Sequence, residues 1–330
     1  MTTLLNAEPH GYSEEARAIL QRLGTLIDDN VSQDDLPGSM RGVDVLIVRL
    51  HLEVNRGVLE SGTELRAVVT ATTGLDHIDM EAAAARGVAV LSLRGERKFL
   101  DTIPATAELT WALLLSLVRR IPQAMGHVRT GAWDRDSLRG SELAGKRLGL
   151  LGLGRVGRQV ARYGAAFGME VAAFDPYTTE WLDGVKRCET LEDLLSESHV
   201  LSIHVPLDAR TAGLLNEGRL CLLPEGALVV NTARGPILEE AALVKLLEAG
   251  YLAGAAVDVI SGERDASMRN VNPLIRYAAS GGNVVITPHI GGATVESMAR
   301  AEVFMARKLA SFLNGHIGDR TSRTPAVPLA

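Results

Sequence analysis

Short apolar runs recur along the first hundred residues, separated by polar or helix-forming segments. The clearest runs lie at 43–48, 65–69 and 88–91, and they are rich in Val, Leu and Ala. Continuous apolar runs of this length are typical of strands buried on both faces of a parallel sheet. Because helical stretches such as 79–85 alternate with them, the pattern predicts a small parallel α/β unit.

A second and longer series of the same pattern begins at Arg147. We expect its strands at 147–151, 170–174, 200–205, 227–231, 254–259 and 283–287. Six strands with helices between them form a doubly wound parallel sheet. The expected fold class is therefore α/β with two Rossmann-like domains, a doubly wound one and a smaller flavodoxin-like one.

Two apolar segments are expected to be helices. The segment 105–118 follows Pro104, which suits a helix start, and it is too short and too interrupted by Glu108 to cross a bilayer. The segment 295–313 comes after the last strand of the second sheet, so we expect the chain to return to the first domain. The expected domains are 1–103 plus 294–330 and 104–293, with a loose tail at 315–330.

The strand at 147–151 leads into three glycines, Gly152, Gly154 and Gly157, and the next strand ends at Asp175. This spacing is typical of a dinucleotide-binding turn, in which the glycines allow a tight turn, close approach of a pyrophosphate and close helix packing. An acid at the end of the second strand binds ribose hydroxyls and repels a 2′-phosphate. The sequence therefore predicts an NAD site, with NAD preferred over NADP.

The composition of the chain limits its expected binding partners and its expected cellular location. The chain has 330 residues, 46% of them hydrophobic, and a formal net charge of −6, which argues against nucleic acid and membrane as partners. Only Cys188 and Cys221 occur, and they form no CxxC motif. The N-terminus lacks the basic region and apolar core of a signal peptide. We therefore expect a cytoplasmic protein without disulfides and without a metal site.

Three polar residues follow strands of the second series at the edge that holds the glycine loop. Arg234 can clamp a substrate carboxylate and polarise a keto oxygen. His289 can exchange a proton with that oxygen, and Glu263 can orient the imidazole and favour its charged form. Each residue alone has an ordinary explanation, as a surface charge, a solvated acid or a packed histidine. Their joint placement predicts hydride transfer between NAD and a 2-keto acid.

Four motifs together resemble the signature set of the D-isomer-specific 2-hydroxyacid dehydrogenases, especially the phosphoglycerate and glycerate dehydrogenase branch. They are the glycine loop with Asp175, Asn231-Thr-Ala-Arg234-Gly235, residues 256–263, and Thr287-Pro-His289-Ile-Gly-Gly292. The resemblance extends from residue 43 to residue 313 and implies Arg234, Glu263 and His289 as catalytic residues. It also implies a homodimer through the NAD-binding domain, with an intersubunit arm around 115–150. The implied cofactor contacts are Gly152, Gly154, Arg155, Val156, Gly157, Asp175, Val205, Thr232, Ala233, Asp258, Gly291 and Gly292.

The loop 72–79 is similar to the family's substrate loop, whose backbone N–H groups receive the substrate carboxylate. The residues alone indicate only a glycine turn between a strand and a helix. The resemblance implies that Thr73 and Gly74 bind substrate together with Arg234. His77 is expected to be a packing residue, and His204 suits either a cofactor border or an ordinary strand end.

The chain departs from the family pattern in three places. About five residues are inserted at 92–98, so Arg94, Arg97 or Lys98 either contacts a second anionic group of the substrate or belongs to a solvated loop. Arg264 replaces the usual proline after Glu263, and the segment that follows is longer and more polar. Leu50 replaces a small polar residue, and Arg49 either reaches the substrate or forms a structural ion pair.

Two classes of function compete. The first is an NAD-dependent oxidoreductase acting on a small D-2-hydroxy acid or 2-keto acid. The second is an NAD-sensing, corepressor-like binding protein of the same family. Nothing in the sequence suggests an interaction tail or a nuclear address, which argues against this second class. Oxidation of another small anion is a third possibility. An acid at position 263 disfavours formate but leaves phosphite open.

Overall fold

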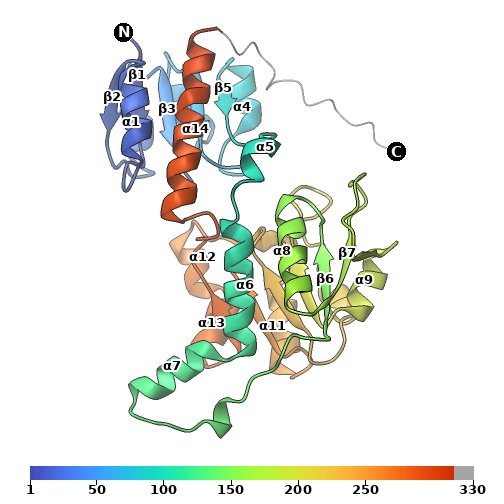
Figure 1. Cartoon of the computed structure of the whole chain (residues 1–330). Coiled ribbons are helices and arrows are strands. Elements are labelled where there is room, and N and C mark those ends of the chain that lie inside the picture. Colours follow the sequence, from blue (N-terminus) through green and yellow to red (C-terminus); the bar gives the residue numbers. More distant parts are fainter. Residues whose placement is uncertain (316–330) are drawn as a thin grey trace. The chain divides into compact units, whose positions relative to one another are not determined.

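The computed structural model describes residues 1–315, and the chain divides into two compact units. One unit consists of Met1–Leu100 and Thr294–Ala330, and the other of Asp101–Ala293 (Figure 1). The first unit is thus built from two separate stretches of the chain. Beyond Gly315, the expected loose tail lies outside the described residues.

The sheet of the first unit is parallel throughout and has the strand order β2-β1-β3-β4-β5. This is the flavodoxin-like order, as predicted. The strands are β1 (Thr3–Asn6), β2 (Thr25–Asp28), β3 (Val45–Val48), β4 (Ala67–Thr70) and β5 (Ala89–Leu91).

Helices cover both faces of this sheet, and alternate strand residues pack against one face or the other. Val45 and Ile47 of β3 belong to the core under two long helices, whereas Leu46 and Val48 belong to the core under the shorter ones. The first pair of helices is α1 (Glu14–Gln21) and α14 (Val295–Leu313), which lie side by side (Figure 1). The shorter helices are α2 (Leu36–Ser39), α3 (Arg56–Ser61) and α4 (Met80–Ala85), and α5 (Arg97–Leu100) follows β5.

A buried ion pair attaches α14 to the N-terminal part of this unit. Arg49, just after β3, donates through Nη2 to Oε1 of Glu302 at 2.5 Å, and Oε2 of Glu302 accepts from the Ser13 N–H at 2.7 Å. The Glu302 side chain is only 2% exposed and that of Arg49 is 18% exposed. The guanidinium also lies over the Tyr12 ring. Of the two roles open to Arg49, the structure shows the ion pair.

The second unit contains a seven-stranded parallel sheet with the order β12-β11-β10-β9-β6-β7-β8. The centre of this order is that of a doubly wound sheet, in which the chain starts in the middle and builds outward in both directions. The strands are β6 (Arg147–Leu151), β7 (Glu170–Phe174), β8 (Val185–Arg187), β9 (Val200–Ile203), β10 (Leu228–Asn231), β11 (Gly254–Val257) and β12 (Val284–Ile286).

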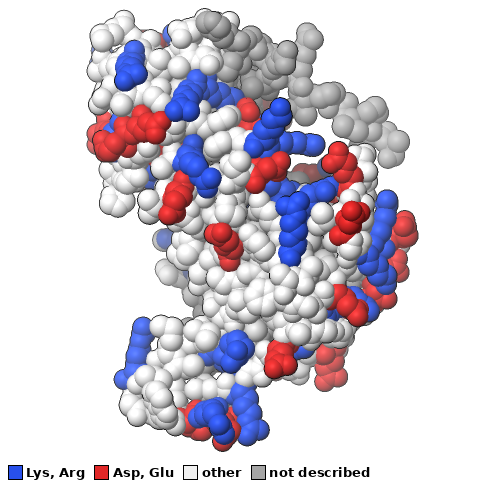
Figure 2. All heavy atoms as spheres, in the orientation of Figure 1, with Lys and Arg blue, Asp and Glu red and all other residues white. Residues whose placement is uncertain are grey.

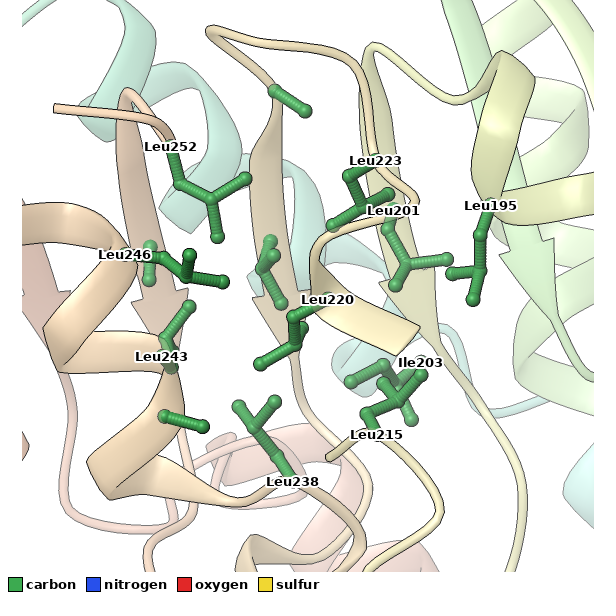
Figure 3. Close-up of a cluster of buried hydrophobic side chains, with 14 of the residues drawn as sticks. Leu195, Leu201, Ile203, Leu215, Leu220, Leu223, Leu238, Leu243, Leu246 and Leu252 are labelled. Carbon is green, nitrogen blue, oxygen red and sulfur yellow. The ribbon is translucent and has the colours of Figure 1, made fainter. Parts of the chain in front are cut away.

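Two helix layers enclose this sheet as well. On one face, α6 (Ala105–Val118) and α8 (Arg155–Ala166) pack together and cover Leu148 and Leu150 of β6 (Figure 1). On the other face, leucines from β9, the loops and three helices fill the layer shown in Figure 3. Those helices are α9 (Leu191–Glu197), α10 (Glu217–Leu220) and α11 (Glu240–Glu248). The remaining helices are α7 (Ile121–Arg129), α12 (Ala266–Val271), α13 (Pro273–Ala279) and the 3-10 turns η1 (Asp136–Leu138) and η2 (Gly235–Ile237).

Most predicted strands are present with slightly different bounds, and the structure contains further elements that the sequence pattern did not predict. The helices expected at 105–118 and 295–313 have these bounds in the structure. The strands β1 and β2 and the edge strand β8 were not predicted, so the second sheet has seven strands instead of six. The helix α7 was not predicted either.

Charged side chains do not gather into a single-sign surface on the face that Figure 2 shows, where acidic and basic groups are interspersed. This distribution agrees with the low net charge of −6. Within residues 1–315, no helix is both long enough and apolar enough to cross a membrane.

Replacing Glu302 with Ala should strongly destabilise the first unit. The change leaves the Arg49 guanidinium and the Ser13 N–H without their buried acceptor, a loss that costs about 3 to 5 kcal/mol. Urea unfolding followed by far-UV circular dichroism measures both units. Fluorescence follows only the second unit, where all three tryptophans lie: Trp111, Trp133 and Trp181.

The matched control is Glu15→Ala, because it removes another carboxylate that pairs with α14. Its partner is Arg307, and the two side chains are 63% and 67% exposed. Exposed pairs contribute little to stability, so the control should unfold like the wild type. Equal unfolding curves for the two variants would show that the Arg49–Glu302 pair does not anchor α14.

Candidate active site

The carboxyl ends of five neighbouring strands in the second unit carry the predicted site residues. In spatial order, β6, β9, β10, β11 and β12 lead into the glycine loop, Val205, Arg234, Glu263 and His289. The chain reverses its direction of growth between β6 and β9, and ligands of open α/β sheets bind at such a switch point. The parallel sheet therefore assembles these residues along one edge.

The three glycines of the loop have different physical reasons to lack a side chain. Gly152 has φ +98°, and a Cβ there would come within 2.9 Å of the His204 backbone. A Cβ on Gly157 would lie 2.2 Å from the Gly152 carbonyl oxygen. Gly154, in contrast, has negative φ and open space around its missing Cβ. The fold itself thus requires Gly152 and Gly157, whereas the space at Gly154 is available to a ligand.

Asp175 braces the glycine loop from the end of β7. Its Oδ2 accepts from the Leu153 N–H at 2.9 Å, and its Oδ1 accepts from the N–H groups of Tyr177 and Thr178 at 2.9 and 3.1 Å. These bonds orient the carboxylate beside the turn, and Oδ2, which accepts one of the three, keeps a further lone pair. The carboxylate is thus held where ribose hydroxyls could donate to it.

Two other groups border the loop. Arg155, the first residue of α8, donates to the Ile103 carbonyl at 3.0 Å, and burial lowers the pKa of its guanidinium. His204 follows β9, lies 2.8 Å from Ser202 Oγ through Nε2, and has its pKa lowered by burial to about 3. The His204 imidazole is therefore neutral near pH 7.

The turn that carries Arg234 is braced by a buried asparagine. Asn231, fully buried at the end of β10, donates to the Arg234 carbonyl at 2.9 Å and accepts from the Ala233 N–H at 3.0 Å. Thr232 Oγ1 lies 2.9 Å from Thr110 Oγ1 of α6. The backbone of Arg234 is thus fixed independently of its side chain.

The turn that carries His289 is held by Asp258, which is 1% exposed. One Asp258 oxygen accepts from Thr287 Oγ1 at 2.6 Å and the Ile290 N–H at 2.8 Å, and the other accepts from the Gly291 N–H at 2.7 Å. His289 has φ +55°, a conformation that non-glycine residues rarely adopt. Burial raises the pKa of the Asp258 carboxyl, and its three donors offset part of that cost. The Asp258 bonds therefore support a strained residue in the turn.

His289 and Glu263 form a close pair. The imidazole Nδ1 lies 2.6 Å from Glu263 Oε1, and both side chains are about a quarter exposed, at 22% and 24%. An ionised carboxylate only accepts hydrogen bonds, so Nδ1 carries the proton and Nε2 is left to exchange one. The longer segment after Glu263 therefore does not prevent the expected pairing.

The predicted substrate residues Thr73 and Gly74 belong to the first unit, at the carboxyl edge of its own sheet. Thr72 Oγ1 donates to the Gly74 carbonyl at 2.8 Å, which closes the loop. His77 is buried beneath it, with Nε2 3.4 Å from Thr70 Oγ1. This agrees with the expected packing role of His77.

The inserted segment after β5 lies directly beside this loop. The Leu93 N–H donates to the Thr72 carbonyl at 2.9 Å, and Lys308 of α14 holds the segment through Ser92 O and Glu96. Arg94, Arg97 and Lys98 are exposed, and none of them forms an ion pair with a carboxylate in residues 1–315. The segment thus carries three exposed cationic side chains, and its start lies beside Thr72.

Several supporting residues were not predicted from the sequence. Asn231 and Thr287 lie inside recognised motifs but received no role there, and Asp258 was expected only as a cofactor contact. Two further buried residues, Glu240 and Asn272, contact the ends of the segment that carries Glu263. Nothing in the sequence marks them as supporting residues, because an acid at a helix start and an asparagine before proline are ordinary surface features. Their positions become informative only in three dimensions.

The residues around the glycine loop fit a dinucleotide. The space at Gly154 leaves room for a pyrophosphate, and the first N–H groups of α8 lie beside it. Asp175 supplies acceptors for ribose through a carboxylate that backbone N–H groups hold, which suits NAD better than a 2′-phosphate. Within residues 1–315, no cluster of three or more His, Cys, Asp or Glu could hold a metal ion.

Comparison with known proteins identifies the family of this chain. Residues 111–291 match the model of the D-isomer specific 2-hydroxyacid dehydrogenase NAD-binding domain. The chain is 34% identical to a hydroxypyruvate reductase of Thermotoga maritima, over 85% of this chain and 88% of that protein. The crystal structure of a Thermus thermophilus protein superposes with a TM-score of 0.82 at 34% identity, covering 96% and 97% of the two chains. The chain belongs to the D-isomer specific 2-hydroxyacid dehydrogenase family, and NAD is its cofactor.

Other relatives are longer. The chain is 32% identical to a D-3-phosphoglycerate dehydrogenase of Methanocaldococcus jannaschii over 99% of its own length but only 60% of the relative's. The part shared with this protein thus includes both units described above.

Replacing Gly154 with Ala should weaken NADH binding by about tenfold or more without destabilising the fold. The added methyl group meets no protein atom within 4 Å, so it obstructs only a ligand. Titration of NADH fluorescence measures the affinity, and thermal unfolding measures the stability.

Gly157→Ala is the contrasting variant, because its methyl group collides with the Gly152 carbonyl. It should lower the unfolding temperature. Unchanged NADH affinity in Gly154→Ala would mean that the pyrophosphate does not approach this part of the loop.

Proposed function

We propose that this protein is an NAD-dependent oxidoreductase that interconverts a D-2-hydroxy acid and its 2-keto acid. The observation that carries the proposal is the His289–Glu263 pair, 2.6 Å apart, on the same sheet edge as the dinucleotide loop. When bound, NADH supplies a hydride to the keto carbon, and NAD accepts it in the opposite direction. Family membership and the names of the relatives support this reaction.

In this proposal, His289 transfers the proton that must accompany the hydride. During reduction, Nε2 gives a proton to the keto oxygen, and during oxidation it takes a proton from the hydroxyl. Glu263 keeps Nδ1 protonated and the ring oriented. His204 is neutral near pH 7, because burial lowers its pKa to about 3, so it does not supply this proton.

Arg234 is proposed to bind the substrate carboxylate and polarise the keto oxygen. Its braced turn holds the backbone, and Nη1 donates to the Ala233 carbonyl at 2.7 Å. A guanidinium has five N–H donors in a rigid fork, which suits a carboxylate. We propose that Thr73 and Gly74 of the first unit bind substrate through backbone N–H groups. Residues 1–103 and 294–330 would then form the substrate domain, and residues 104–293 would form the NAD-binding domain.

We also propose the remaining cofactor contacts that the family implies. Val205, Thr232 and Ala233 lie at the ends of β9 and β10, next to the glycine loop. Gly291 and Gly292 follow His289, and a Cβ on Gly291 would meet Asp258 Oδ2 at 2.9 Å, whereas Gly292 has open space. Arg155, Val156, Asp175 and Asp258 complete the proposed set.

A homodimer formed through the NAD-binding domain is proposed from the exposed apolar side chains of one helical arm. Ile121, Met125 and Val128 of α7 and Trp133 beyond it are 43%, 52%, 51% and 89% exposed. Aromatic and aliphatic side chains exposed together are typical of an interaction surface.

We propose a cytoplasmic location for the protein. Both cysteines are present as free thiols, which supports this location.

The proposal is tested by following NADH oxidation with a panel of 2-keto acids and by replacing His289 with Asn. The variant should lose about 100- to 10,000-fold in kcat, because general acid–base catalysis contributes that much. Its dissociation constant for NADH, measured by fluorescence, should stay within about twofold of the wild type. Loss of NADH affinity together with kcat would instead place His289 in the cofactor site.

Other outcomes of the panel identify the competing functions. NADH binding without turnover of any keto acid would favour a corepressor-like NAD sensor. Reduction of NAD with phosphite, and no reaction with hydroxy acids, would favour the third possibility, in which the enzyme oxidises a small anion other than a hydroxy acid.

We propose further that Arg94 selects substrates with a second anionic group, such as a phosphate. Arg94→Ala should raise KM for a phosphorylated keto acid about tenfold, because a charge-assisted hydrogen bond is lost, but leave KM for pyruvate unchanged. Arg41→Ala removes another exposed arginine, which precedes β3 at the opposite sheet edge, and should change neither value. Unaltered kinetics in the alanine variants of Arg94, Arg97 and Lys98 would make the segment a solvated loop.

A further inference from the structure

The segment that carries Glu263 is long and has little regular structure. It runs from the end of β11 through a turn and the single short helix α12 to Asn272, before α13 begins. The position of this segment determines whether the Glu263 carboxylate meets His289. Something outside the segment must therefore hold it.

Glu240, the first residue of α11, lies against both ends of the segment. Its Oε1 accepts from the Ser261 N–H at 2.6 Å, and its Oε2 accepts from Asn272 Nδ2 at 2.6 Å. Glu240 is 7% exposed and Asn272 4% exposed. One buried carboxylate thus connects the start of the segment with its end.

Asn272 uses its other side-chain atom to fix the next helix. Its Oδ1 accepts from the Leu274 and Ile275 N–H groups at 3.0 and 3.3 Å and thereby caps α13. The amide is oriented by these bonds, since only its nitrogen can donate to Glu240. The polarity of the Glu240–Asn272 bond is therefore fixed.

A third contact reaches Glu263 itself. Arg269 of α12 donates through Nη1 to the Glu263 carbonyl at 2.6 Å. The backbone of Glu263 is thus held from α12, and α12 is held between Ser261 and Asn272. The side chain of Glu263 then reaches His289 at 2.6 Å.

Keeping a carboxylate at position 240 is unfavourable for the fold alone. Burial raises the pKa of Glu240, and the nearby negative charge of Glu263 acts in the same direction. The hydrogen bonds from the Ser261 N–H and from Asn272 offset part of this cost. The carboxylate thus holds both ends of the segment in spite of its electrostatic cost.

We propose that Glu240 and Asn272 are positioning residues, which hold the segment 261–272 so that Glu263 orients His289. The inference rests on the proposed function, because it assigns these residues to the same proton-transferring pair. It adds to that function two residues that touch neither substrate nor cofactor in the proposed reaction. Their effect is transmitted through the backbone of the segment.

The fixed polarity of the bond allows a test by exchange. Glu240→Gln places an NH₂ group against the Asn272 NH₂ group or the Ser261 N–H, whichever way the amide is turned. Asn272→Asp still caps α13 but opposes two carboxylates. In the double variant, the new amide at position 240 donates to the new carboxylate at position 272, and the net charge equals that of the wild type.

The first measurement is independent of turnover. The Nδ1 proton of His289, hydrogen-bonded to Glu263, should give a downfield signal in imidazole ¹H–¹⁵N spectra, assigned by its absence in His289→Asn. Each single variant should shift or broaden this signal, and the double variant should restore it. With NADH and a keto acid, kcat should fall about tenfold in each single variant and recover to within about threefold in the double variant.

The control is Glu239→Gln, which removes the charge of an exposed neighbour and keeps an acceptor for the Glu217 N–H. It should leave the spectrum and kcat unchanged. Wild-type spectra in both single variants, or a double variant no better than the singles, would overturn the proposal. If the wild type reduces no keto acid, the proposed function fails. The spectra still decide whether Glu240 and Asn272 position His289.

Discussion

The hydrogen bonds from the turn around His289 to the buried Asp258 carboxylate are the interaction on which the site depends. They connect Asp258, the residue just after β11, to the segment after β12. They thereby hold a histidine at φ +55°. A parallel sheet brings the ends of its strands together, but it does not orient the side chains that follow them. That orientation comes from buried polar side chains, Asp258 for His289 and Asn231 for Arg234.

Much of the fold could be predicted because its strands are continuous apolar runs. β3, β4 and β6 are of this kind, and the glycine loop marks the start of the doubly wound sheet. β2 and β8 lie at sheet edges and expose most of their residues, so they carry no such run. β1 is buried, but its sequence Thr3-Leu-Leu-Asn6 contains two apolar residues, too few for an apolar run to stand out.

The proposed catalytic residues could be deduced from strand order, because each one follows a predicted strand of the same sheet. The supporting residues could not. Glu240 lies in sequence between Glu239, which is exposed, and Ala241, and nothing local distinguishes the two acids. Burial differs between them because the segment after β11 folds back over the start of α11. Its residues Ser261 and Asn272, which contact Glu240, lie 21 and 32 positions further along the chain. Long-range polar pairs of this kind leave no periodic signal in a single sequence.

The divided first unit has a consequence for the order of events during synthesis. α14 supplies Ala301, Met305 and Leu309 to the same core as Leu4, Val45 and Val69, and Glu302 to the buried pair. A ribosome completes the contiguous second unit before α14 exists, so the second unit can fold first, although domains usually fold from the N-terminus. Until residues 295–313 emerge, α1 is the one helix of this pair over that core, and the part that α14 covers stays exposed to chaperones or to other nascent chains.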